Sequence, residues 1–289
     1  MRIIIYALAL SLLSCNNYDQ KISNSSIVKS KQAVITANKK NLLNKEICWV
    51  GNLNGTTPIF IHYQRDSNLL IGEITYLNTR AKLPIRLLGT IEEDDKYRLL
   101  EFDETEMITG IIEGIPKENV FKGSWFSPKT KKELQMNLLP KDTVINNPSI
   151  KPDPNQLSGN YHYQYGEYGY NGDFEFNQVG VGKAAIHILS LTNLDRGPNI
   201  AEVDKDTIPF YGNNFIYNIP ESDNCEFKVT FYKGFVYINY TKGYCGSQFG
   251  HNATIDGIYL NKGNNYLYGE EGTPEFERRS CFITMQEII

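Results

Sequence analysis

Short apolar segments recur along most of this chain, and each of them ends in a polar turn. Between residues 57 and 139 the segments follow one another at about 12 residues, a spacing typical of antiparallel sheets built from hairpins. No helical period competes with this pattern over a useful length. Strands are therefore expected at 57–63, 69–77, 83–90, 96–102, 107–115, 120–126 and 134–139.

A proline-rich stretch interrupts the pattern at 140–156. Its prolines disfavour both a helix and a central strand, so we expect a linker here. The linker would join a first all-β domain at 46–139 to a second at 157–289. In the second domain we expect a hairpin turn at 232–234, and strands at 161–165, 173–177, 183–191, 199–204, 214–219, 225–231, 235–241, 253–260 and 276–286. The predicted fold is all-β, with two antiparallel meander barrels or sandwiches.

The first residues resemble an export signal. Arg2 precedes an apolar run at 3–13, which has the length of a signal-peptide core and is too short to span a bilayer as a helix. The run ends in Leu-Leu-Ser-Cys at 12–15, which resembles the bacterial lipobox. That resemblance implies a signal peptide at 1–14, cleavage before Cys15 and acyl chains on Cys15. The alternative is an ordinary signal peptide that happens to contain Cys15.

The segment after Cys15 bears on where such a lipoprotein would reside. Asn16 and Asn17 stand where an Asp retains some lipoproteins in the inner membrane, so the resemblance favours the outer membrane. Residues 15–45 are rich in Asn, Lys, Ser and Gln, and we expect a flexible tether there. The membrane, through lipid on Cys15, is thus the first expected partner.

The other cysteines fit an oxidising compartment, because four of them remain after Cys15. We expect Cys225 to pair with Cys245, since the segment between them has the pattern of one hairpin. Cys48 and Cys281 would form the remaining pair. A zinc site is not expected, because no cysteine pair has close ligand spacing.

Composition and motifs give no support to several function classes. The net charge of −4 provides no basic field for nucleic acid. The motifs of nucleophilic, phosphate-binding and zinc-dependent enzymes do not occur. His62 and His187 lie in strands and are expected to point outward, and the acidic runs at 92–95, 101–104 and 270–271 are interpreted as solvated turns. We therefore expect no catalytic residue, no cofactor and no metal.

A row of tyrosines is the densest aromatic feature. Tyr161, Tyr163 and Tyr165 would share one face of a strand. If exposed, the row could stack on sugar rings or anchor a protein partner. The alternative is that it packs onto the core or lines a barrel mouth.

Two further resemblances concern the second half. Cys225 and the segments 244–250 and 256–259 resemble the ending of small β-barrel domains in envelope lipoproteins of unknown function, over about residues 157–262. Tyr-Thr-Lys-Gly at 240–243 resembles part of a motif in membrane-bound inhibitors of c-type lysozyme, which implies Lys242 as a binding residue. The Ser-Gly-x-x-Tyr motif that precedes it in those inhibitors is absent, and Asp256-Gly-Ile-Tyr follows it instead.

The expected function is therefore a non-enzymatic envelope protein that binds a protein or a glycan. Inhibition of a cell-wall hydrolase, or immunity against one, is its sharpest form. The alternatives are a surface hydrolase or lyase that acts on glycans with turn carboxylates, and a structural subunit of an envelope assembly.

Overall fold

The computed structural model describes residues 47–142, 149–194, 197–243 and 245–262, all within the compact unit Lys45–Ile289. Strands dominate these residues, and the helical elements among them are the short 3₁₀ turns η1 (Glu93–Asp95), η2 (Pro154–Gln156) and η4 (Cys245–Ser247). The predicted all-β fold is confirmed. The expected signal peptide, tether and strand at 276–286 lie outside the described residues, and no described helix has the length and apolar character needed to cross a membrane.

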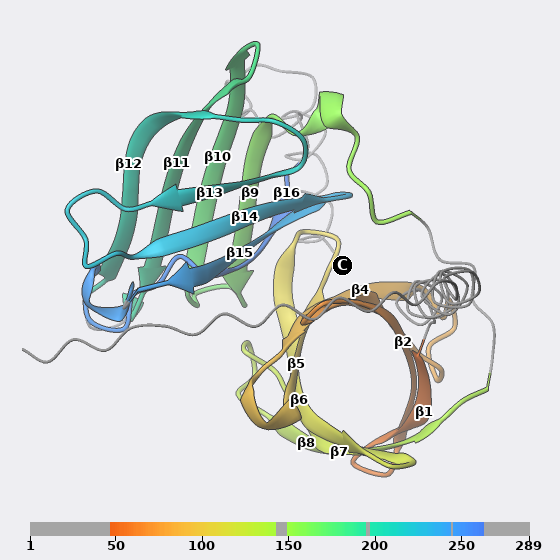
Figure 1. Ribbon diagram of the computed structural model, residues 1–289. Coiled ribbons are helices and arrows are strands. Elements are labelled where there is room, and N and C mark those ends of the chain that lie inside the picture. The colour runs from red at the N-terminus through yellow and green to blue at the C-terminus, as the bar shows by residue number, and fades with distance from the viewer. Residues whose placement is uncertain (1–46, 143–148, 195–196, 244, 263–289) are drawn as a thin grey trace, which may run out of the picture. The chain divides into compact units, whose positions relative to one another are not determined.

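The first eight strands close into an antiparallel barrel, which Figure 1 shows along its axis. Each strand pairs with the next, and the last pairs with the first through contacts such as Val50 opposite Leu139. The strands are β1 (Ile47–Leu53), β2 (Thr57–Asp66), β3 (Leu69–Tyr76), β4 (Pro84–Ile91), β5 (Tyr97–Phe102), β6 (Met107–Lys117), β7 (Val120–Phe126) and β8 (Glu133–Pro140). Sequence analysis missed β1, the strand that closes the barrel.

Aromatic side chains fill the interior of this barrel. Trp49 and Tyr97 each pack edge-on against Phe121, with ring centroids 5.8 and 6.0 Å apart. The Trp49 indole N–H donates a hydrogen bond to the Tyr63 hydroxyl at 3.0 Å. An eight-stranded barrel has an interior just wide enough for side chains to fill, and this one has a packed aromatic core.

Glu101 corrects one sequence-based interpretation. It belongs to the acidic run at 101–104, but it lies inside the barrel and is only 5% exposed. Its carboxylate accepts hydrogen bonds from the Tyr76 hydroxyl at 2.8 Å, the Trp125 indole at 3.0 Å and the Thr109 hydroxyl at 3.2 Å. These donors replace the water that a buried carboxylate loses. The run at 92–95 is exposed, as expected.

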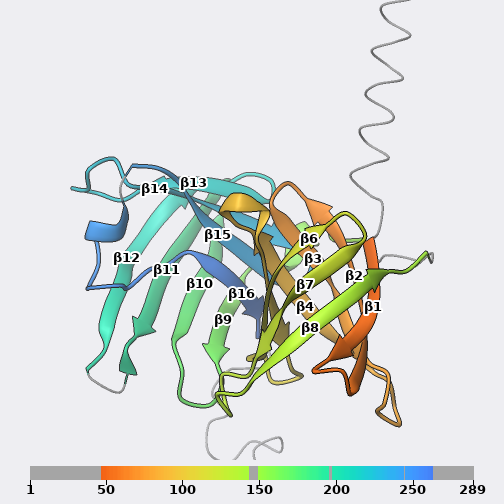
Figure 2. The same cartoon turned by 90° about the horizontal axis from the view of Figure 1, so that it is seen from below.

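The second half forms one antiparallel sheet that curls over a phenylalanine-rich core. Its strand order is β12-β11-β10-β9-β16-β15-β14-β13, and Figure 2 shows β12 to β9 side by side. Phe176 on β10 lies 4.6 Å from Phe231 on β14, centroid to centroid, so the two halves of the sheet face each other. The strands are β9 (Gly159–Tyr165), β10 (Asn171–Gly180), β11 (Lys183–Thr192), β12 (Asn199–Pro209), β13 (Asn214–Asn218), β14 (Glu226–Tyr232), β15 (Phe235–Lys242) and β16 (Gly257–Asn261).

The expected hairpin turn is present, because β14 and β15 pair up to Tyr232 opposite Phe235. The outer face of this hairpin packs against the barrel within the same compact unit. Phe235 shares one apolar cluster with Leu88 and Leu100 of the barrel. The Tyr232 hydroxyl donates to Asp66 at 2.9 Å, and β9 adds a short parallel pairing to β6. This contact positions residues of β5 and β6 beside the end of β9.

Candidate binding cleft

A cleft of about 540 Å³ opens where the end of β9 meets the barrel. Its volume falls within the range of small-molecule sites. The barrel and the turn after β7 supply Arg98, Leu100, Ile108, Ile111, Phe126, Pro128 and Lys131. The second sheet and its turns supply Tyr163, Tyr165, Tyr168, Gly169, Tyr170, Thr192, Asn193, Leu194, Asn252, Thr254, Asp256, Gly257 and Ile258.

Tyrosine rings form one side of the cleft. Tyr165 packs edge-on against Tyr163, with centroids 5.8 Å apart, and lies 6.4 Å from Tyr170. Tyr168 and Tyr170, in the turn between β9 and β10, are 79% and 52% exposed. Gly169 makes this turn possible, because a Cβ there would lie 1.8 Å from the Tyr165 carbonyl oxygen. The turn therefore extends the buried rings into an exposed aromatic rim.

The predicted tyrosine row divides between the core and the cleft. Tyr161 is buried against Phe174 and Phe231, and its hydroxyl donates to the Leu157 carbonyl at 2.7 Å. Tyr163 is also buried, with its hydroxyl 2.8 Å from the Ser190 hydroxyl. Burial raises the pKa of both hydroxyls. Tyr161 thus packs into the core, while Tyr163 and Tyr165 line the cleft.

A cation from the barrel contributes to the lining. The Arg98 guanidinium lies 2.9 Å from the Glu113 carboxylate, which also contacts the Lys96 ammonium at 2.6 Å. Burial alone would lower the pKa of Arg98, but the neighbouring Tyr165 hydroxyl and Glu113 outweigh it and raise that pKa. For Tyr165 the effect of burial is the opposite: burial raises the pKa of its hydroxyl and outweighs Arg98, which would lower it. The cleft therefore presents a stable cation beside a neutral phenol.

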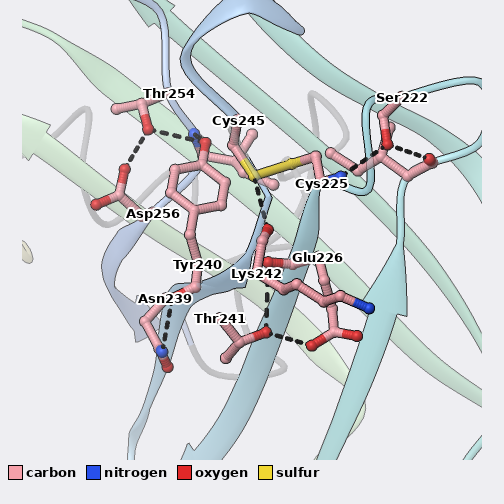
Figure 3. The surroundings of a disulfide bond; sticks show 12 residues. Ser222, Cys225, Glu226, Asn239, Tyr240, Thr241, Lys242, Cys245, Thr254 and Asp256 are labelled. Atoms are coloured by element: carbon pink, nitrogen blue, oxygen red, sulfur yellow. Dashed lines mark hydrogen bonds between the residues drawn. A yellow bond between two sulfur atoms is a disulfide. The ribbon is translucent and has the colours of Figure 1, made fainter.

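Asp256 supplies the opposite charge. This exposed carboxylate accepts a hydrogen bond from the Thr254 hydroxyl, which lies 2.9 Å from the Tyr240 hydroxyl. Tyr240 also accepts a hydrogen bond from the backbone N–H of Ile255 at 3.2 Å. Figure 3 shows this chain of contacts beside the disulfide. Thr254 thus links the exposed Asp256 carboxylate to the Tyr240 hydroxyl.

The disulfide between Cys225 and Cys245 confirms the predicted pair. Both cysteines are buried, and the bond ties the start of β14 to the segment that follows β15 (Figure 3). Cys48 is also buried. Its predicted partner, Cys281, lies outside the described residues, so that pair stays a prediction.

Lys242 lies apart from the cleft. It is an exposed residue at the end of β15, opposite Glu226, and is not among the residues that line the cleft. Its carbonyl oxygen lies 3.7 Å from the Cys245 sulfur, so its backbone is held beside the disulfide (Figure 3). The structure therefore does not bring Lys242 together with Tyr163 and Tyr165.

His62, His162 and His187 each lie beside a single carboxylate. His187 on β11 is part-exposed and lies 3.1 Å from Glu202. His62 faces away from the barrel interior as expected, 3.2 Å from Glu73, but its side chain is largely buried. In the part of the chain that the structure describes, no group of three or more His, Cys, Asp or Glu residues is placed to hold a metal ion.

Arg98 and Asp256 were not predicted as site residues. They are far apart in the sequence, and only the contact between the second sheet and the barrel brings both to the end of β9. The segment 165–170 did carry a signal, because tyrosines alternate there with turn glycines. A comparison with models of known protein families finds no match, and neither does a comparison with curated proteins.

Proposed function

We propose that this chain is a non-enzymatic, lipid-anchored protein of the cell envelope whose cleft binds a glycan. The observation that carries the proposal is the aromatic rim of Tyr168 and Tyr170 beside a cation, Arg98, and a carboxylate, Asp256. The apolar C–H faces of a sugar ring pack on aromatic rings. Its hydroxyl groups donate to a carboxylate and accept from a guanidinium in charge-assisted hydrogen bonds.

The single acid in the cleft lining favours binding over hydrolysis. Glycoside hydrolysis uses two carboxyl groups separated by roughly 5–9.5 Å on either side of the scissile bond. Among the described residues that line the cleft, Asp256 is the only acid. Glu101 is inside the barrel, and its carboxylate is occupied by three donors. The arrangement supports a site that holds a glycan without cleaving it.

The anchoring part of the proposal rests on the sequence around Cys15 and on the disulfide. Disulfides persist in oxidising compartments such as the bacterial periplasm and cell surface. The Cys225–Cys245 disulfide is therefore compatible with an exported protein. We infer that Cys15 carries acyl chains and holds the protein at a membrane, with the outer membrane favoured over the inner. Mass spectrometry of the mature amino terminus tests this. An unmodified Cys15 or an intact leader would refute it.

The glycan proposal is tested by titration calorimetry with soluble peptidoglycan fragments. The protein is residues 16–289 without lipid, which keeps the whole unit Lys45–Ile289. Tyr168→Ala and Tyr170→Ala should each weaken binding about fivefold, because one stacking contact is worth about 1 kcal/mol. Tyr211→Ala is the matched control, since Tyr211 is 76% exposed and does not line the cleft.

Two results would contradict the proposal. One is the absence of heat with every fragment tested, and the other is equal affinity in the rim variants and the control.

The inhibitor form of the function is separate, because it depends on Lys242, which is exposed outside the cleft lining. It predicts that the protein inhibits a lysozyme and that Lys242→Ala loses this inhibition. Absence of inhibition across lysozyme types would exclude this form and leave the glycan proposal standing.

A further inference from the structure

One end of the β10–β11 hairpin lies at the cleft. At its other end, two turns of the second sheet meet. One is the turn between β10 and β11 with the adjoining strand ends, residues 178–183, and the other is the turn between β12 and β13 with the last residue of β12, residues 209–213. The Phe210 N–H donates to the Gly182 carbonyl at 3.0 Å. Tyr211 lies against Gly182, where a Cβ would come within 2.3 Å of its hydroxyl. We call these two segments the tip. The turn after β10 projects at the top of Figure 1.

The tip exposes three large apolar side chains. Val181 is 101% exposed, Tyr211 76% and Val179 57%. Turns of this length normally carry Gly, Asn, Asp or Ser, which suit the backbone and remain hydrated. A fully exposed valine adds nothing to the packing of the fold. Single exposed apolar residues are ordinary, but a cluster at one place points to a surface that it contacts.

The charges of the tip indicate the kind of surface. Residues 178–183 and 209–213 contain Lys183 and neither Asp nor Glu, although acids outnumber bases in the chain, 33 to 29. The tip therefore has no carboxylate that an anionic surface would repel or that would lose its water there. The two valines belong to the projecting end of the β10–β11 hairpin, and neither they nor Tyr211 lines the cleft. Projecting side chains suit insertion into a fluid layer.

We propose that the tip inserts into the interface of a lipid bilayer that carries anionic headgroups. Val179 and Val181 enter the boundary of the acyl chains, and Tyr211 takes the headgroup level, where amphipathic rings are enriched. Lys183 contacts lipid phosphate. The proposal requires neither glycan binding nor lipid on Cys15. Since β10 has ten residues, insertion would hold the cleft about 30 Å from the bilayer surface.

The test uses residues 16–289 without lipid and vesicles of phosphatidylethanolamine and phosphatidylglycerol. The unmodified sequence should float with these vesicles. Val181→Asp should lower the partition coefficient at least about tenfold, because it removes the most exposed apolar side chain and adds a negative charge. Leu83→Asp is the matched control, since Leu83 is 62% exposed on the barrel. It should float like the unmodified sequence.

A second variant reports the contact directly. Val181→Trp should show a blue-shifted tryptophan emission with vesicles, and brominated lipids should quench it. The proposal is overturned if the unmodified sequence stays unbound, if Val181→Asp floats equally well, or if the new tryptophan remains in water. It is also overturned if Val181→Asp dissolves a dimer seen by light scattering, since a second copy would then cover the tip. Tyr168→Ala should leave vesicle binding unchanged.

Discussion

Removal of the Cys225–Cys245 disulfide should lower the free energy of unfolding by about 3 kcal/mol. The two cysteines are 20 residues apart in the sequence. A cross-link that closes a loop of this length removes about 11 cal/mol/K of chain entropy from the unfolded state, which is about 3.3 kcal/mol at 25 °C. Alanine is the appropriate replacement, because both sulfur atoms are buried and a serine hydroxyl would need a new partner.

Urea denaturation of Cys225→Ala/Cys245→Ala, followed by circular dichroism, measures the change. With a slope of about 3 kcal/mol/M, the midpoint should fall by about 1 M. A loss below about 1 kcal/mol would refute the loop-entropy reasoning. The same variant, measured with and without reductant, also tests the second predicted pair. A further fall on reduction is expected if Cys48 and Cys281 are bonded, and an unchanged midpoint would argue against that bond.

Two other predictions concern charge and packing in the second sheet. Burial alone would raise the pKa of Asp173, but the hydrogen bond to His162 and the nearby Lys262 outweigh it and lower that pKa. Asp173 therefore adds stability above its unfolded pKa of about 3.9 and loses it as the pH falls through the lower folded value. Asp173→Asn should flatten the acid limb of a urea midpoint–pH profile below about pH 4, and an unchanged limb would contradict this. Phe176→Ala should cost about 3–5 kcal/mol in urea denaturation, because it empties a fully buried site. A cost below about 1 kcal/mol would show that the core collapses around the gap.

The period-2 alternation of apolar residues was enough to predict most strands. It fixes the inward face of β14, where the buried Phe227, Val229 and Phe231 alternate with part-exposed residues. It was less informative for β1, where Cys48, Trp49 and Val50 form a continuous apolar run. The same alternation could have placed Glu101, which follows Tyr97 and Leu99 on the inward face of β5. The acidic neighbours of Glu101 concealed that signal.

The site was less predictable than the fold. The tyrosine row was visible in the sequence because Tyr163 and Tyr165 are neighbours on one strand. The charged lining of the cleft includes Arg98 of the barrel and Asp256 of the second sheet, and both line one cleft only because the second sheet contacts the barrel where β9 pairs with β6. Contacts of this kind depend on which outer faces pack together. An apolar outer residue such as Leu100 looks the same in the sequence whether it packs on another sheet or contacts water.

The strand order of the second sheet leaves β12 and β13 with one partner each among the described strands. Such an open edge could recruit a strand from a neighbouring molecule. On β12 the residues Glu202, Asp204, Lys205 and Asp206 are exposed, and β13 has only five residues. Charged and short edges discourage pairing between copies. Neighbouring molecules at high local concentration should therefore stay separate, because their edge strands do not pair into fibrils.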